Sequence, residues 1–185
     1  MRPSRVVEAL LFASEVPLSA AELVRGDEDL DEDKVDQAIA ELKQEYEMED
    51  RAFGIFEIAG GYQILTRPEY AHVLERFDAV PVAPRLSTAA LETLGVIAYR
   101  QPVGRAEVEE IRGVGAGGVL KTLLERNLVE VVGRGEGLGR PLLYGTTRHF
   151  LEHFGFNSLA ELPRSEELDI ILADRIADAP SPTTD

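Results

Sequence analysis

The sequence predicts a mainly helical α+β protein built from two copies of one small unit. First, 44% of its 185 residues are hydrophobic, enough for a folded core. Second, residues 17–23 reappear as a similar pattern at 102–108, and Thr66, Tyr70 and Leu74 align with Thr146, Phe150 and Phe154. Third, Pro81 and Pro84 disfavour helix between the two copies. We therefore expect a first domain over 1–78, a linker over 79–86, a second domain over 87–163 and a mostly disordered acidic tail over 164–185.

The first copy begins with a helix over Pro3–Ala13, followed by Ser19, a suitable N-cap for a short helix over Ala20–Val24. A longer helix over Asp31–Glu47 has apolar residues at steps of three and four, which predicts one buried stripe. The stripe consists of Val35, Ala38, Ile39, Leu42 and Tyr46. Strands over Phe53–Ile58 and Tyr62–Thr66 flank Gly60-Gly61, and Pro68 suits the first turn of a helix through Arg76.

The second copy repeats this order. Ser87 is the expected N-cap of a helix to Tyr99, followed by a short helix over Val103–Ile111 and a longer one over Gly118–Arg126. Leu120, Leu123 and Leu124 are expected to face inward. Strands over Val129–Val132 and Leu142–Tyr144 surround the loop 133–139. Three helices plus a β-hairpin form the winged-helix plan, so the prediction is two winged-helix domains in tandem. In the tail, Glu166–Ala177 has the spacing of a marginal helix, with Leu168, Ile171, Leu172 and Ile176 near one face.

Charge restricts the classes of partner. The net charge is −15, and residues 1–80 contribute 8 basic and 19 acidic side chains, a net of −11. Residues 81–162 are neutral, with 9 of each. Because DNA binding needs a basic face, this distribution favours a protein partner and predicts little direct DNA binding. Cysteine is absent, which excludes disulfides and thiolate metal sites, and the short apolar runs predict neither a signal peptide nor a membrane span.

Three motifs resemble functional sites, and each has a simpler explanation. Gly113, Gly115 and Gly118 match the dinucleotide pattern, but the preceding segment is helical by pattern, so we expect a turn between helices. His149, Glu152 and His153 match an inverted zinc-protease motif without a third ligand nearby. We expect Phe150 and Phe154 to face the core and the histidines to face solvent.

The third motif is the acidic run of Asp27, Asp29 and Asp31. It begins like a calcium loop but has Glu32 where that loop needs glycine, so its expected role is at a helix N-terminus. The sequence thus predicts no enzyme, no cofactor and no metal.

Three segments of the second copy also resemble a known family. Residues Arg100–Val114, Leu120–Arg126 and Gly139–Thr147 resemble segregation and condensation protein B, and the similarity extends over most of 3–163. The resemblance implies a bacterial, non-enzymatic subunit of two winged-helix domains that pairs through its N-terminal domains. It also implies a kleisin partner, segregation and condensation protein A, which connects the subunit to a structural-maintenance-of-chromosomes ATPase. Where the family usually has a polar capping residue, this chain has 115–118 (Gly-Ala-Gly-Gly), so we expect a frayed helix start.

The expected function is therefore that of a dimeric adaptor in chromosome condensation and segregation, cytoplasmic and associated with the nucleoid through its complex. The alternative is a DNA-binding tandem winged-helix transcription regulator. Pro102 and Pro141 fix turns that present neighbouring side chains outward. The expected kleisin contacts in the second domain are Arg100, Gln101, Arg105, Arg140 and Tyr144. The expected dimer contacts in the first domain are Val6, Leu10, Leu11, Tyr70 and Val73.

Overall fold

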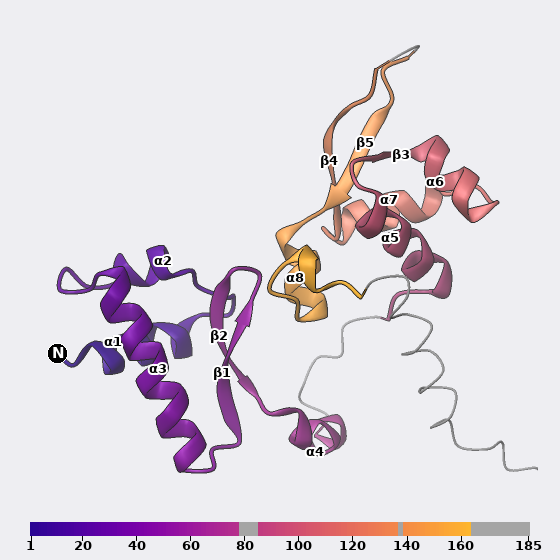
Figure 1. Ribbon diagram of the computed structural model, residues 1–185. Helices are drawn as coiled ribbons and strands as arrows, with labels where there is room; N and C mark the ends of the chain where they lie inside the picture. The colour runs from indigo at the N-terminus through magenta and orange to yellow at the C-terminus, as the bar shows by residue number, and fades with distance from the viewer. Residues whose placement is uncertain (78–84, 137–138, 164–185) are drawn as a thin grey trace, which may run out of the picture.

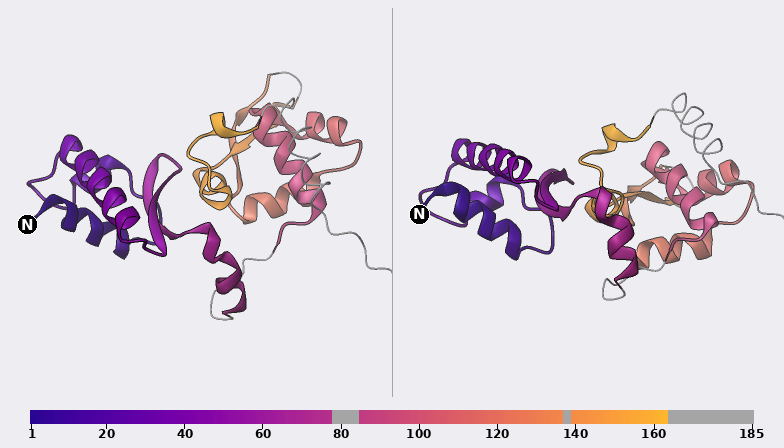
Figure 2. Two further views of the ribbon diagram at one scale, coloured as in Figure 1. Left: turned by 60° about the horizontal axis from the view of Figure 1, so that its bottom comes forward. Right: turned by 90° about the horizontal axis from the view of Figure 1, so that it is seen from below.

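Two separate hydrophobic cores organise the chain, one in each half (Figure 1). The computed structural model describes residues 1–77, 85–136 and 139–163. The predicted linker lies largely outside the described residues, as does the whole predicted tail. In the views of Figures 1 and 2 the two halves form two lobes of an elongated molecule, called here the first unit and the second unit. Within the described residues, no helix has both the length and the apolar character that a bilayer crossing requires.

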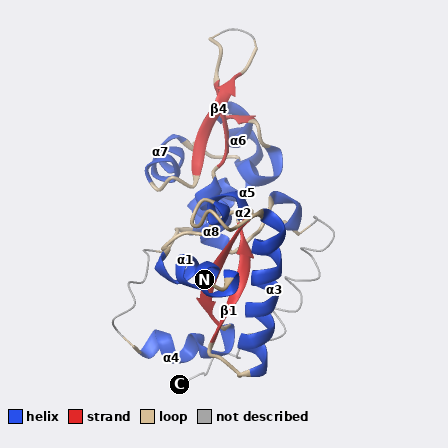
Figure 3. Cartoon of the chain, turned by 90° about the vertical axis from the view of Figure 1, so that its left-hand side faces the viewer, coloured by secondary structure: helices blue, strands red, loops and turns tan. Residues whose placement is uncertain are grey.

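The first unit consists of three helices, a β-hairpin and a closing helical segment. Its elements are α1 (Pro3–Ala13), α2 (Ala20–Val24), α3 (Glu32–Met48), β1 (Phe53–Ile58), β2 (Gly61–Thr66), the 3-10 turn η1 (Pro68–Tyr70) and α4 (Ala71–Arg76). Ser19 forms the predicted cap together with Glu22, in a reciprocal capping box. All five predicted stripe residues of α3 are buried in the first core. In Figure 3, α3 lies beside α1 and the hairpin.

The turn of the first hairpin lies one residue earlier than the sequence predicted. Ala59 and Gly60 occupy it, with φ of 52° and 71°, while Gly61 belongs to β2. At Gly61 a Cβ would lie 2.8 Å from the carbonyl carbon of Leu18, because Leu18 and Tyr62 form a β-bridge there. Gly61 therefore allows the extended segment at Leu18 to lie close to β2, and it is not part of the turn.

The second unit follows the same order and adds a two-residue strand before its second helix. Its elements are α5 (Thr88–Arg100), β3 (Val103–Gly104), α6 (Arg105–Arg112), α7 (Gly117–Glu125), β4 (Val129–Arg134), β5 (Leu142–Thr146), α8 (Arg148–Phe154) and η2 (Leu159–Glu161). The sheet order is β3-β5-β4, with both neighbouring pairs antiparallel. The predicted class, a mainly helical α+β protein with two winged-helix units in tandem, is confirmed.

Three predictions about the helices of the second unit were wrong. Val103 begins strand β3 rather than a helix, because its fully buried side chain is held where the strand pairs with Tyr144. Leu124 and Phe154 were expected in the core, yet both are exposed at the surface. Neighbours one turn earlier, Leu120 and Phe150, occupy the core instead.

Candidate functional site

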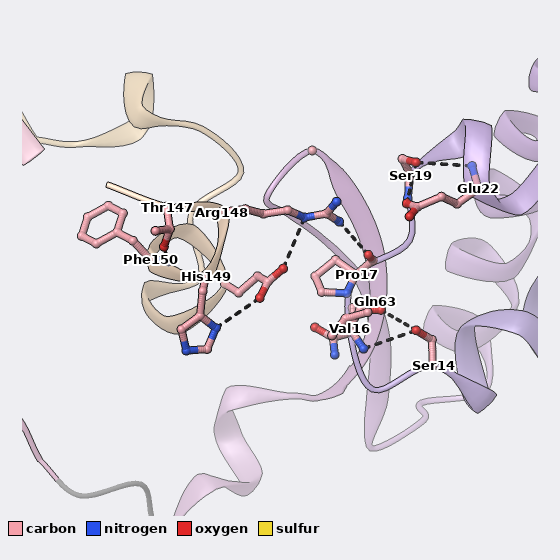
Figure 4. Close-up of polar contacts among 12 residues, drawn as sticks. Ser14, Val16, Pro17, Ser19, Glu22, Gln63, Thr147, Arg148, His149 and Phe150 are labelled. Atoms are coloured by element: carbon pink, nitrogen blue, oxygen red, sulfur yellow. Dashed lines mark hydrogen bonds and ion pairs between the residues drawn. The ribbon is translucent and has the colours of Figure 1, made fainter. Parts of the chain in front are cut away.

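Among the residues that the structure describes, three hydrogen bonds join the two units, at what we call the inter-unit seam (Pro17, Ala59, Gly60, Arg148, Phe156 and Asn157). Arg148 Nη2 donates to the Pro17 carbonyl oxygen at 2.8 Å (Figure 4). The Ala59 and Gly60 amides, in the first hairpin turn, donate to the Phe156 carbonyl at 2.9 Å and to Asn157 Oδ1 at 2.8 Å. Glu152 orients Arg148 through an ion pair of 3.3 Å. The sequence analysis did not find this contact, because no local pattern links residues more than 90 positions apart.

The turn between α6 and α7 is held by a network around Glu109. Arg105 Nε donates to Glu109 Oε1 at 2.7 Å, and the Ala116 amide donates to the same oxygen at 2.9 Å. The hydrogen bond from Ala116, followed by that from Arg105, holds the pKa of Glu109 below its ordinary value. Glu109 thereby satisfies a free amide at the start of α7 that no side chain of α7 caps. The start of α7, which the sequence predicted to be frayed, is therefore capped by a residue of the preceding helix, α6.

Gln101, one of the expected kleisin contacts, is engaged within its own unit. Its Oε1 accepts from the Thr146 amide at 2.7 Å, and its Nε2 donates to Thr146 Oγ1 at 3.0 Å. The side chain therefore joins the end of α5 to β5. The peptide bond to Pro102 is cis, at the sharp turn that the sequence predicted.

The other four expected kleisin contacts divide by exposure. Tyr144 is buried in the second core and does not form part of a surface, contrary to its expected role. Arg100, Arg105 and Arg140 are exposed. Arg140 has φ of 41°, and its carbonyl oxygen accepts from Arg134 Nη1 at 3.4 Å. The three arginines are thus the accessible members of the predicted set.

The wing of the second unit presents an apolar surface that the sequence analysis did not list. Val131, Val132 and Leu142 are large apolar side chains exposed on the β4–β5 hairpin. In Figures 1 and 3 this hairpin points away from the first unit. Consecutive exposed apolar residues in one strand depart from the alternation expected of a half-buried strand, and that departure was readable in the sequence at 131–132.

The first unit has a groove between α1, α3 and the hairpin. The groove has a volume of about 350 Å³ and is lined by Arg5, Glu8, Ala9, Phe12, Tyr46, Phe53 and Ile64. Phe12 is 82% exposed at its edge. Inside it, the Tyr46 hydroxyl donates to Glu8 Oε1 at 2.8 Å, and Arg5 pairs with both Glu8 and Glu45. Burial and the hydrogen bond to Glu8 raise the pKa of Tyr46. Partial burial acts to raise the pKa of Glu8, but hydrogen bonds from Arg5 and Tyr46 hold it below its ordinary value.

The expected dimer residues lie in different environments. Leu11 is 1% exposed and belongs to the first core, so the prediction that it lies on the surface was wrong. Val6 and Leu10 are half-buried against the same core. Tyr70 is half-buried, and Val73 is 50% exposed. Val73 lies on α4, a helix with no buried residue. Among the expected dimer residues, Val73 on α4 is therefore the one most accessible to a second copy of the chain.

None of the three motifs forms a functional site among the described residues. Gly113 is the left-handed C-cap of α6, so the glycine pattern follows a helix and lacks the strand that dinucleotide binding needs. His149 Nδ1 lies 3.3 Å from Glu152 Oε2, and Asp31 caps α3 by accepting from the Lys34 amide at 2.8 Å. Over residues 1–77, 85–136 and 139–163, no three His, Cys, Asp or Glu side chains converge in a way that could hold a metal ion.

Comparison with known proteins yields one consistent relationship. A family model described as "Segregation and condensation complex subunit ScpB" matches residues 5–165. Segregation and condensation protein B of Geobacillus thermodenitrificans is 48% identical over 164 residues, covering 88% of this chain and 78% of that protein. The crystal structure of ScpB from Mycobacterium tuberculosis is 33% identical and covers 83% of this chain and 95% of that one, with a TM-score of 0.39.

A second solved structure covers only the first half of the chain. It is a dimer of an ScpB N-terminal domain complexed with an ScpA peptide, 29% identical over 44% of this chain and 92% of that one, with a TM-score of 0.38. Because both TM-scores are below 0.5, the relationship to known proteins rests on sequence and not on superposition.

Proposed function

Because this chain belongs to the segregation and condensation protein B family, we propose that it is a non-enzymatic adaptor subunit of a condensin-like complex. In this role it binds a kleisin, segregation and condensation protein A, and through it a structural-maintenance-of-chromosomes ATPase, in chromosome condensation and segregation. The observation that carries the proposal is 48% identity across 88% of the chain. The complex works in the cytoplasm, on the nucleoid.

The surface of α3 supports a protein partner over DNA. In winged-helix proteins that bind DNA, the third helix usually enters the major groove. Here that helix is α3, and it begins with Glu32 and Asp33 directly after the capping Asp31. The exposed residues Asp36, Glu41 and Glu47 extend the negative charge along it. Phosphate repels such a surface, so the alternative function, a DNA-binding transcription regulator, is not favoured.

The adaptor acts as a homodimer joined through the first unit. Helix α4 supports this arrangement, because Val73 and Phe77 expose apolar surface in and directly after a helix that has no buried residue. Burying such surface against a second copy removes it from water, and a two-fold arrangement pairs the same patch on each copy. Sedimentation at tens of micromolar should show a dimer, and the variant V73D should shift it toward monomer without unfolding the chain.

The kleisin footprint lies on the second unit and includes Arg100, Arg105 and Arg140. Arginine is one of the residue types that anchor interfaces, because it combines apolar area with directional hydrogen bonds. The neighbouring exposed apolar surface of the wing supplies area of the kind that a bound segment buries. Gln101 and Tyr144 leave the contact set, since their side chains serve their own unit.

Calorimetric titration with the purified kleisin tests both the function and the footprint. R105A and R140A should each weaken binding by roughly 1–3 kcal/mol, the usual range for interface anchors. R25A, an exposed arginine of the first unit, is the matched control and should bind normally. If F12D in the first-unit groove abolishes binding while R105A and R140A bind normally, the footprint lies on the first unit. If the unmodified chain does not bind the kleisin at all and instead binds random duplex DNA with a steep salt dependence, the proposed function is wrong.

A further inference from the structure

Arg105 is exposed, yet its side chain is held in one position. Its Nε donates to Glu109 Oε1 at 2.7 Å, one turn further along α6. The same oxygen accepts from the Ala116 amide at 2.9 Å, so Glu109 is itself fixed to the start of α7. The side chain of Arg105 is 58% exposed. It is therefore an accessible arginine whose guanidinium is anchored through Glu109 to the next helix.

Gly117, the first residue of α7, lies directly beneath this guanidinium. A Cβ at Gly117 would lie 3.0 Å from each of three Arg105 atoms, Cζ, Nη1 and Nη2. Equal distances to three atoms of a planar group place the face of the guanidinium over the glycine. A side chain at 117 would therefore displace Arg105. At the next residue, Gly118, a Cβ would meet no atom within 4 Å.

This position leaves one edge of the guanidinium available. Glu109 occupies Nε, and among the described residues neither Nη1 nor Nη2 of Arg105 donates a hydrogen bond. The paired N–H groups of a guanidinium edge match the two oxygens of a carboxylate. An exposed arginine normally loses rotamer freedom when it binds, whereas Arg105 is already ordered, which lowers that cost.

We propose that Arg105 binds a carboxylate of the kleisin, from an Asp or Glu side chain, through its Nη1–Nη2 edge. Glu109 and Gly117 act as positioning residues that hold the guanidinium ready for it. The inference rests on the proposed function, because it assigns the chemistry of one contact in the proposed kleisin footprint. Since Glu109 is also bound to the Ala116 amide, the incoming carboxylate adds at the free edge and does not replace Glu109.

Two neighbouring glycines provide a matched test by calorimetric titration with the purified kleisin. G117A should weaken binding about three- to tenfold, because the new methyl group displaces Arg105. G118A makes the same substitution one residue later, in open space, and should bind like the unmodified chain. Both variants should melt no lower than the unmodified chain, since alanine favours a helix more than glycine does. A purely structural role of Gly117 would not weaken binding in a chain of undiminished stability.

A double-mutant cycle identifies the route of the effect. In the R105A background, G117A should cause no further loss of affinity, because the side chain that it displaces is absent. An equal loss in both backgrounds would show that the effect passes through α7 and would overturn the positioning role. R105K keeps the charge but lacks the planar fork, so it should bind nearly as weakly as R105A. Unchanged affinity of R105K would exclude the two-pronged carboxylate contact.

The same titrations separate this inference from the function on which it rests. If R105A weakens binding while G117A and G118A both bind normally, Gly117 does not position Arg105, and the adaptor function stands. If R105A itself binds normally, Arg105 is not a kleisin contact and the inference fails alone. If the unmodified chain does not bind the kleisin, the inference and the proposed function fail together.

Discussion

Arg148 Nη2, in the first turn of α8, lies 2.8 Å from the carbonyl oxygen of Pro17, 131 positions earlier in the chain. Pro17 precedes the capping box of α2, so the hydrogen bond ties the entry to one helix-turn-helix to the closing helix of the other unit. Together with the amides of Ala59 and Gly60, it gives the seam contacts with two different loops of the first unit.

R148A should therefore loosen the orientation of the two units without unfolding either. Because the Arg148 side chain is about half exposed, its loss should cost only about 0.5–1 kcal/mol. Small-angle scattering should show a broader distribution of maximum dimensions than for the unmodified chain. R134A changes an arginine of the second unit that hydrogen-bonds to the Arg140 carbonyl oxygen within its own wing, and it should leave the scattering unchanged. An R148A profile identical to that of the unmodified chain would show that the seam does not set the orientation.

Glu109 should make the start of α7 sensitive to acid. The pKa of Glu109 is lowered in the folded chain, first by the Ala116 amide and then by Arg105. A lowered folded-state pKa contributes stability above the unfolded value, and this contribution is lost as pH falls through the folded value. The protection factor of the Ala116 amide, which corrects its exchange for the intrinsic rate at each pH, should therefore be high near neutral pH and fall as the solution becomes acidic. In E109Q that pH dependence should be weaker, whereas E110Q, on the same helix, should retain it.

Gln101 should matter for stability rather than for binding. Q101L keeps much of the side-chain volume but leaves the half-buried Thr146 amide without its acceptor. An unsatisfied group of this kind costs about 1–3 kcal/mol. Urea unfolding should show that loss, while the affinity for the kleisin should stay within experimental error for the fraction that is folded. A normal midpoint with weakened kleisin binding would restore Gln101 to the contact set.

Leu11 and Val73 should behave differently, although both were predicted at the dimer interface. L11A removes a side chain that is 1% exposed in the first core, which should cost about 2–5 kcal/mol in free energy of unfolding. V73A, at a half-exposed position, should cost much less and should act on the dimer. Thermal melts compared with sedimentation at one protein concentration separate these effects. An L11A variant of normal stability would contradict the assignment of Leu11 to the core.

Local sequence signals predicted the helices and hairpins well. Ser19 and Ser87 cap the helices they were expected to cap, because a capping hydrogen bond involves residues only three positions apart. Asp31, predicted as the first residue of its helix, is instead the N-cap of α3. The internal repeat was also informative. Leu18 and Val103, which align at an offset of 85, both pair with a strand of their own unit, although in the first unit the pairing is a single bridge.

The wrong predictions concern residues whose secondary structure or burial is determined by tertiary contacts. Val103 has the pattern of a helix start but forms a strand, because its partner Tyr144 comes from 41 positions later. Tyr144 and Leu11 were selected for residue type and helical face, which do not reveal whether the facing side belongs to the core or to a surface. The exposed Phe12 was missed for the same reason, although it directly follows Leu10 and Leu11, which the sequence analysis assigned to the dimer interface.

The first-unit hairpin has a consequence for how this chain tolerates change in length. Its turn contains only Ala59 and Gly60, and both amides are committed to the second unit. An insertion there would displace both donors at once, so the turn should resist lengthening. The corresponding hairpin of the second unit, formed by β4 and β5, points away from the first unit (Figure 1). A change of length in the second hairpin should therefore disturb the contact between the two units less than the same change in the first.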